Sequence, residues 1–233
     1  MAKVQTNIKG TEVVLDIARK YNRKVLLAST SEVYGKNEQV PFREEDDSLF
    51  GATTYSRWSY ACSKAIDEFL GLAYHKQYGL PVIIARFFNT VGERQSGQYG
   101  MVIPRFVRAA LAGEPITIYG DGKQSRCFGY VMDVIDGITS LVNDPGSYGQ
   151  VFNIGSTEEI SIEALAFKIK SLAGSSSEII YLPYEEAYGQ GFDDMRRRIP
   201  SLDKIEKQVG YRPKTSLDQI LEKIIAYFRR QVN

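Results

Sequence analysis

Helical segments with one apolar face alternate with short apolar runs along this chain, and this alternation constrains its fold more than any other feature. Residues Thr11–Tyr21 carry apolar side chains at helical spacing, and the apolar run Lys24–Ser29 follows at once. Trp58–Tyr78 is helical again, ends before Gly79, and precedes the apolar run Val82–Phe87. Such runs are typical of parallel strands that helices cover on both faces. The order therefore predicts an α/β layer fold.

The same alternation continues through the second half of the chain. It predicts a helix over Met132–Val142 and a third strand over Val151–Gly155. Amphipathic spacing predicts two more helices, over Ile160–Ala173 and Leu217–Phe228. Ile179–Leu182 is expected to form a strand of a smaller sheet.

The first predicted helix has apolar side chains on one stripe. Val13, Val14, Ile17 and Ala18 form this stripe. The charged residues between them are expected to face water: Glu12, Asp16, Arg19 and Lys20.

Composition excludes several classes of protein. The 29 Lys and Arg residues nearly balance 28 Asp and Glu residues, which argues against a nucleic-acid partner. No segment approaches the roughly 20 apolar residues of a membrane span. Cys62 and Cys127 have no metal-ligand or redox spacing, which favours a reducing, cytoplasmic location. His75 is the only histidine, so no histidine-based metal site is expected.

A tyrosine and a lysine lie one helical turn apart in the second predicted helix. Tyr60 and Lys64 occupy positions i and i+4, so both side chains lie on one face. A phenol has an ordinary pKa near 10, and a nearby ammonium lowers that pKa and makes the phenol a usable acid and base. The spacing alone is weak evidence, because Tyr119 and Lys123 share it across a turn rather than a helix.

The strand that precedes this helix ends in hydroxyls and a carboxylate, where a parallel strand should meet its ligand. Read alone, this segment could be no more than a polar turn. Other motifs occur before and after this segment along the chain. They are Thr6–Thr11, Ser29–Gly35, Tyr60–Lys64, Arg86–Gly92, Ile118–Gly122 and Asn153–Gly155.

In this order and at these separations, the motifs resemble those of the extended short-chain dehydrogenases/reductases, specifically the nucleotide-sugar epimerases, dehydratases and decarboxylases. The resemblance implies NAD as cofactor. It implies that Tyr60 is the acid and base at the sugar 4-hydroxyl and that Thr30 binds the same hydroxyl. It implies that Lys64 binds the nicotinamide ribose and lowers the pKa of Tyr60, with Ser29 and Phe88 beside the cofactor.

The resemblance also implies which residues bind the nucleotide sugar. Asn89 resembles the asparagine that holds the diphosphate, and Arg126 resembles an arginine that contacts a phosphate. A guanidinium suits that role because it binds phosphate in a bidentate fork. Without the family context, Arg126 could equally be an exposed turn arginine. Tyr119 and Arg196 complete the expected substrate-binding set.

The residues after Thr30 bear on which reaction follows oxidation at C4. Sugar 4,6-dehydratases typically carry an Asp-Glu pair there, whereas this chain has Ser31 and Glu32, so it is a poor dehydratase candidate. The Ser-Glu pair and Arg198 are more similar to UDP-glucuronate decarboxylases, in which the arginine would steer a carboxylate or the departing CO₂. The resemblance therefore assigns Ser31, Glu32 and Arg198 to the catalytic set. The run 196–198 could instead be a solvated charged turn.

Three functional hypotheses stay open. The first is a UDP-glucuronate decarboxylase or, almost equally, a UDP-sugar 4-epimerase. The second is a non-catalytic nucleotide-sugar binder, and the third is an inert or dimerising fragment. The last two arise because no Gly-x-x-Gly-x-x-Gly turn for the NAD pyrophosphate occurs, so the chain is expected to be truncated or part of a split protein. The strand at Lys24–Ser29 would then be an exposed edge.

The expected architecture is a partial Rossmann layer with a smaller α/β lobe. We assign 1–92 and 130–156 to the NAD-binding layer, and 93–129 and 157–233 to the nucleotide-sugar lobe. The ligand should lie between them, at the carboxyl ends of the strands. Family members usually dimerise through the helices that match Thr11–Tyr21 and Trp58–Tyr78, so a homodimer is expected.

Overall fold

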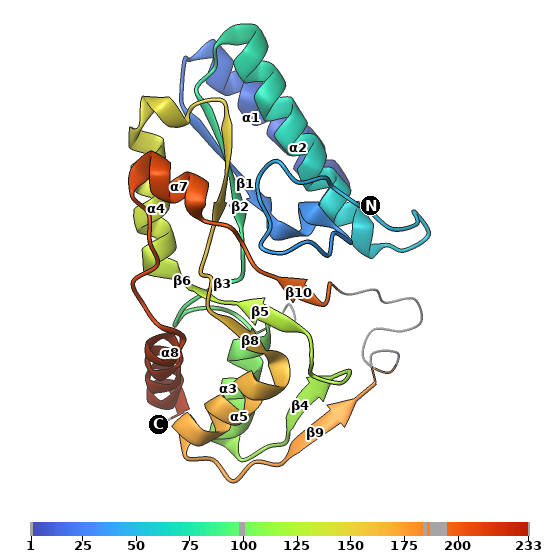
Figure 1. Cartoon of the computed structure of the whole chain (residues 1–233), viewed down its shortest axis with the longest axis vertical. Helices are drawn as coiled ribbons and strands as arrows, with labels where there is room; N and C mark the ends of the chain where they lie inside the picture. The colour runs from blue at the N-terminus through green and yellow to red at the C-terminus, as the bar shows by residue number, and fades with distance from the viewer. Residues whose placement is uncertain (1, 98–100, 184–185, 187–194, 233) are drawn as a thin grey trace.

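A three-stranded parallel sheet forms the centre of the upper half of the molecule (Figure 1). The computed structural model describes residues 2–97, 101–183, 186 and 195–232. The strands β1 (Val25–Thr30), β2 (Val82–Phe87) and β7 (Gln150–Ile154) lie in the order β1-β2-β7. Thr30 pairs with Phe87, and Phe87 pairs with Ile154, so the three carboxyl ends meet at one edge. The predicted α/β fold is confirmed.

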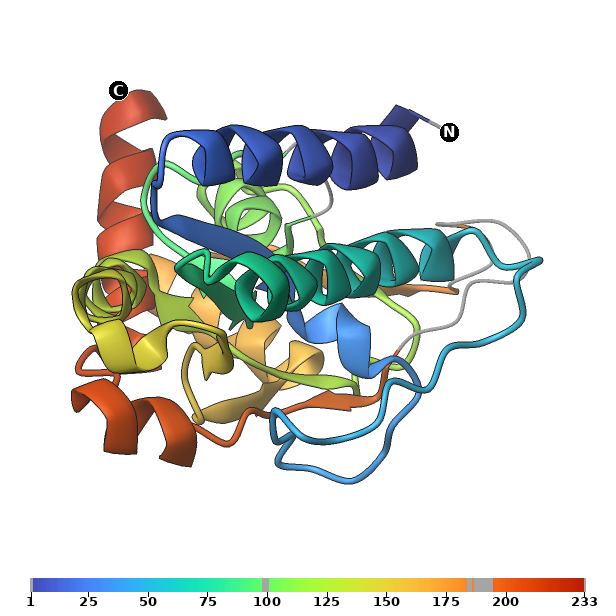
Figure 2. The same cartoon turned by 90° about the horizontal axis from the view of Figure 1, so that it is seen from above.

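Helices cover both faces of this sheet, and Figure 2 shows α1 and α2 side by side on one of them. Successive side chains of β2 therefore pack on opposite faces of the sheet. Val82 and Ile84 pack on the α1 and α2 face, while Ile83 and Ala85 pack on the opposite face. The helices are α1 (Ala2–Lys20) and α2 (Arg57–Tyr78) on the first face, and α4 (Val131–Asn143) and α7 (Asp203–Val209) on the second.

Helix α1 buries a different stripe from the predicted one. It packs on the sheet through Leu15 and Ala18, which are 0% and 6% exposed. Of the predicted apolar stripe only Ala18 is buried, because Val13, Val14 and Ile17 are 50–55% exposed. The helix has apolar side chains on two sides, and periodicity alone does not decide which side meets the sheet.

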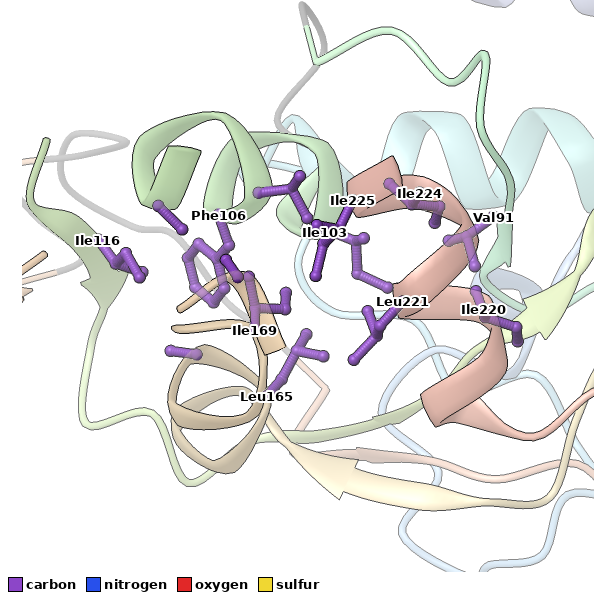
Figure 3. Packing of buried hydrophobic residues seen from close by; sticks show 14 of the residues in the cluster. Val91, Ile103, Phe106, Ile116, Leu165, Ile169, Ile220, Leu221, Ile224 and Ile225 are labelled. Atoms are coloured by element: carbon purple, nitrogen blue, oxygen red, sulfur yellow. The ribbon is translucent and has the colours of Figure 1, made fainter. Parts of the chain in front are cut away.

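The carboxyl edge of the sheet faces a smaller lobe, drawn in the lower half of Figure 1. Its paired strands β4 and β9 are parallel, which confirms the predicted second sheet at Ile179–Leu182. Phe106, Ile169, Leu221 and Ile224 interlock in its apolar core (Figure 3), and each is fully buried. The lobe comprises α3 (Val102–Ala112), β4 (Ile116–Tyr119), α5 (Ile162–Ala173), β9 (Ile179–Leu182) and α8 (Leu217–Val232).

Short strands that the sequence does not predict join the sheet to the lobe. Strand β5 lies between β10 and β8, and β3 pairs with β6. These strands have two or three residues each, too few for an alternating pattern to appear in the sequence. They are β3 (Thr90–Val91), β5 (Ser125–Cys127), β6 (Gly129–Tyr130), β8 (Glu159–Ser161) and β10 (Arg197–Arg198).

The close packing of α4 on the sheet depends on Gly137. A methyl group there would lie 2.6 Å from Cδ2 of Tyr211 and 2.8 Å from Cδ1 of Ile154. The Tyr211 ring cannot easily yield, because it is buried and its hydroxyl donates to the carbonyl of Gly155 at 2.8 Å. Gly137→Ala is therefore expected to lower the free energy of unfolding by about 1–3 kcal/mol, less the ~1 kcal/mol that alanine gains in a helix.

Urea denaturation measures this difference, and Gly10→Ala in α1 is the matched control. A methyl group at Gly10 meets nothing within 4 Å, so that variant should be unchanged or more stable by up to about 1 kcal/mol. Equal stability of the Gly137→Ala and Gly10→Ala variants would contradict the tight contact at α4.

Candidate active site

Strand β1 delivers its polar end directly to the carboxyl edge of the sheet. Thr30 ends β1 and caps the 3-10 helix η1 (Ser31–Tyr34), because its Oγ1 accepts from the amide N–H of Glu32 at 3.3 Å. Ser31 is 2% exposed, whereas the Glu32 side chain is 24% exposed. Of the predicted catalytic residues in η1, only Glu32 therefore reaches the solvent side.

Tyr60 lies in the first turns of α2 and faces this strand end. Its side chain is partly open to solvent, with the residue 38% exposed, and its phenol lies near enough to the Thr30 hydroxyl for that hydroxyl to lower the pKa of Tyr60. The structure thus brings Tyr60 and Thr30 together, as the sequence motifs lead one to expect. An accessible phenol near a second hydroxyl can exchange a proton with a bound carbinol.

Lys64 is near Tyr60 on the same helix, but its ammonium has another partner. Nζ donates to Oδ2 of Asp67 at 2.8 Å, and Asp67 is 1% exposed. Burial raises the pKa of Tyr60, and the carboxylates of Glu32 and Asp67 raise it further, against a smaller lowering by the Thr30 hydroxyl. The pKa of Tyr60 is thus raised in this chain, and the lowering by Lys64 that the resemblance implies stays a prediction.

The three consecutive arginines of the sequence point to different partners. Arg198 forms an ion pair with Glu32 at 3.6 Å, and its side chain is 11% exposed. Nε and Nη2 of Arg197 each donate to one carboxylate oxygen of Glu159 at 2.8 Å. Arg196 is exposed, and its carbonyl accepts from the backbone of the neighbouring strand. Only Arg198 of the three joins the group around Tyr60.

Strand pairing places a second predicted arginine beside Arg198. Strands β10 and β5 are parallel, and Arg198 is in register with Arg126. Arg126 is 7% exposed, and its Nη1 donates to the carbonyl of Ser125 at 2.7 Å. Arg126 is therefore not an exposed turn arginine. Two guanidinium groups far apart in the sequence lie on adjacent strands and offer positive charge to an anionic ligand.

The remaining predicted site residues occupy the ends of β2 and β4. Asn89 directly follows the sheet edge, and its Nδ2 donates to the carbonyl of Cys127 at 3.0 Å. The Phe88 side chain is buried, so only its backbone lies at the edge. Tyr119 ends β4 and stacks under the guanidinium of Arg105, 4.0 Å from the ring centre. The predicted turn after Tyr119 is confirmed, with φ of +72° at Gly120.

A buried ion pair under the site was not predicted. Arg86 on β2 donates to Glu68 on α2 through Nη2 at 2.7 Å and Nε at 3.0 Å. Both residues are less than 8% exposed, and Ser29 donates a short hydrogen bond to the same carboxylate. Two signals were available: Glu68 lies two turns after Tyr60, and Arg86 is the one charge in an apolar strand. The Ser29 hydroxyl is therefore bound to the Glu68 carboxylate of this ion pair.

The ion pair continues into a buried polar row across the sheet. Arg86 is in register with Asn153, whose Oδ1 accepts from the Tyr34 hydroxyl at 2.7 Å. The Arg86 guanidinium lies 4.8 Å from the centre of the Tyr34 ring and donates to the carbonyl of Glu44 at 3.0 Å. Burial raises the pKa of Tyr34 to about 12, so its hydroxyl stays protonated as a donor. These linked hydrogen bonds stabilise the buried residues beside the site.

The donor groups at the site suit a ribose or sugar better than a metal ion. Tyr60 and Thr30 offer hydroxyls, and Lys64 has two N–H donors beyond the one that Asp67 takes. Among the described residues, no three His, Cys, Asp or Glu side chains gather as metal ligands would. None of the helices, as far as they are described, has the length and apolar character to cross a membrane.

Known proteins match nearly the whole chain. A family profile described as GDP-mannose 4,6 dehydratase matches residues 1–224. A UDP-N-acetyl-alpha-D-glucosaminuronate decarboxylase of Bacillus cytotoxicus is 45% identical over 99% of the chain and 71% of its own length. UDP-glucuronic acid decarboxylase 1 of Danio rerio is 38% identical over 98% of the chain. The chain spans 53% of that protein, and about half of several other curated relatives.

Solved structures of sugar epimerases have the same fold. The UDP-glucose 4-epimerase of Thermotoga maritima, solved with UDP-glucose, has a TM-score of 0.87 and 29% identity over 99% of the chain and 71% of its own. The UDP-glucuronic acid 4-epimerase of Bacillus cereus, solved with UDP-glucuronic acid and NAD, has a TM-score of 0.86 and 26% identity over 98% of the chain and 68% of its own.

Proposed function

The chain belongs to the GDP-mannose 4,6-dehydratase family of extended short-chain dehydrogenases/reductases, and from that premise we propose that it modifies a UDP-sugar through a 4-keto intermediate with NAD as cofactor. We favour decarboxylation of a UDP-uronate. The observation that carries this proposal is the contact between Glu32 and Arg198 close to Tyr60 and Thr30. A cation next to a proton-transfer group suits a sugar that bears a carboxylate.

Tyr60 performs the proton transfer in this proposal. Once the phenol has released its own proton, the phenolate accepts the proton of the sugar 4-hydroxyl as C4 is oxidised, and Thr30 orients that hydroxyl by a hydrogen bond. The resulting ketone is β to the uronate carboxylate, so the bond to CO₂ breaks and its electron pair forms the enolate of C4 and C5. A proton from water at C5 restores the ketone. Tyr60 then returns its proton to the oxygen at C4 when the ketone is reduced. General acid and base catalysis of this kind contributes about 10²–10⁴-fold.

The residues at the site fit the nicotinamide half of NAD. Lys64 would bind the ribose hydroxyls with the N–H donors that Asp67 leaves available, and the backbone near Ser29 and Phe88 would line the ring. When bound, NAD would accept the hydride from C4 and return it to the ketone in the last step. Arg126 and Asn89 would hold the diphosphate of the nucleotide sugar.

Arg198 provides the test of substrate choice. Arg198→Met is expected to weaken binding of UDP-glucuronate relative to UDP-glucose by about 10–100-fold, because it removes a hydrogen bond between charged groups worth about 1.5–3 kcal/mol. Arg197→Met is the matched control, since Arg197 is turned toward Glu159. Isothermal calorimetry with both ligands measures the effect, and equal losses for the two ligands would contradict a carboxylate role.

Turnover separates the proposal from its alternatives. With NAD and UDP-glucuronate or UDP-N-acetylglucosaminuronate, decarboxylation is expected to release CO₂ and a UDP-sugar lighter by that mass. A product of unchanged mass would instead favour a 4-epimerase, the activity named for the two solved structures above. Binding of the UDP-sugar without NAD binding or turnover would support a non-catalytic binder, and no binding of either would contradict the proposal.

We also propose a cytoplasmic homodimer. Both cysteines are free thiols, which supports a reducing compartment. Apolar side chains are exposed on the two adjacent helices that family members use to dimerise, including Val13, Ile17 and Phe69, which is 73% exposed. Sedimentation equilibrium should give twice the mass of the chain, and a monomer at micromolar concentration would contradict the dimer.

A further inference from the structure

Asp67 is a buried carboxylate that the proposed mechanism does not use. The residue is 1% exposed, and it follows Tyr60 by seven positions and Lys64 by three, which puts all three side chains on one stripe of α2. Oδ2 accepts from Nζ of Lys64 at 2.8 Å. Oδ1 is buried and has no hydrogen-bond partner within the described part of the chain.

This burial leaves Asp67 dependent on Lys64. A carboxylate removed from water is costly unless a charge of opposite sign compensates it, and losing one partner of such a pair is strongly unfavourable. The Lys64 side chain is only 14% exposed, whereas lysines in other ion pairs, Lys168 and Lys214, are 34% and 79% exposed. The pair is therefore part of the interior and not one of the weak surface pairs.

We propose that Asp67 is a positioning residue for Lys64, and that its carboxylate holds the ammonium in one direction on the active-site face of α2 before any ligand arrives. Lysine otherwise has a flexible four-carbon stem, so an anchor removes most of its rotamers. Two N–H donors of the ammonium remain for a ligand. This assignment rests on the proposed roles of Lys64 and Tyr60.

The anchor has a consequence for Tyr60. The charged groups that act on its phenol are Glu32 from η1, which is paired with Arg198 of β10, and Asp67 with Lys64 from α2 itself. While Asp67 holds the ammonium, the positive charge is neutralised, and burial together with the two carboxylates raises the pKa of Tyr60. Before a ligand binds, Tyr60 is therefore a protonated phenol, and it must release that proton before it can accept the one from the sugar 4-hydroxyl.

The first measurement detects the anchor directly. In protein labelled with ¹⁵N-lysine, Lys64 is expected to give an ammonium resonance whose protons exchange slowly with water, identified by its loss in Lys64→Met. Asp67→Asn should abolish the slow exchange and Asp67→Glu should restore it. Asp218→Asn, the same change at the exposed pair with Lys168, should leave it intact. Absence of such a resonance in the parent protein overturns the proposal, even if Asp67→Asn does not fold.

The second measurement follows Tyr60 itself. The absorbance of tyrosinate against pH, taken as the difference between each protein and its Tyr60→Phe counterpart, isolates one of the 15 tyrosines. Tyr60 is expected to ionise at lower pH in Asp67→Asn than in the parent, and Asp67→Glu and Asp218→Asn should match the parent. An unchanged titration in folded Asp67→Asn overturns the proposal. Neither measurement requires turnover, so failure of the proposed activity would be seen separately.

Discussion

Tyr60→Phe is expected to lower the rate of UDP-sugar conversion by at least ~10²-fold while leaving nucleotide-sugar affinity nearly unchanged. The substitution removes only the phenolic oxygen, which is the group that accepts the proton of the 4-hydroxyl. The side chain is 38% exposed and its ring can stay where it is, so no cavity or unfolding contributes to the loss. The change would thus appear in kcat and not in the dissociation constant.

Single-turnover kinetics and calorimetry on the same preparation measure the two quantities. Tyr78→Phe is the matched control, because Tyr78 ends the same helix and is 46% exposed. It should retain full activity. If Tyr60→Phe kept the parent rate, Tyr60 would have no part in the chemistry.

Glu68→Gln is expected to lower the free energy of unfolding by about 3–5 kcal/mol, because it leaves the charge of Arg86 buried without compensation. The amide has the same shape as the carboxylate. The loss of unfolding free energy is therefore due to the missing charge and not to a change in packing. Both partners are under 8% exposed, and three hydrogen bonds from the guanidinium end on this carboxylate. The pair also joins α2 to β2, about two helical turns after Tyr60.

Urea denaturation measures the loss, and Glu206→Gln is its control. The pair between Glu206 and Arg212 is exposed on both sides, so the same substitution should cost about 0–1 kcal/mol there. A double variant, Glu68→Gln with Arg86→Met, should lose less than the sum of the two single variants, because the uncompensated charge is gone. A loss under about 1 kcal/mol in Glu68→Gln would contradict the buried pair.

Local patterns in the sequence determined much of the architecture. Apolar runs of strand length between amphipathic helices identified β1, β2 and β7, since a doubly covered parallel strand has no polar face. The same logic located the motif at the strand end and the helix that carries Tyr60. These predictions succeed because backbone geometry alone sets the periods of 2 and 3.6 residues.

The tertiary structure decided which side chains face each other. Periodicity marked two apolar sides of α1 and could not show that Leu15, not Val13, meets the sheet. The strand pairing that sets Arg198 beside Arg126 joins segments too short to have a period of their own. The partner of Lys64 depends on the burial of Asp67, because a carboxylate three residues on is solvated on a surface helix and captures the ammonium only where water is excluded. Burial and distance between remote segments are properties of the fold, and they set the charge around Tyr60.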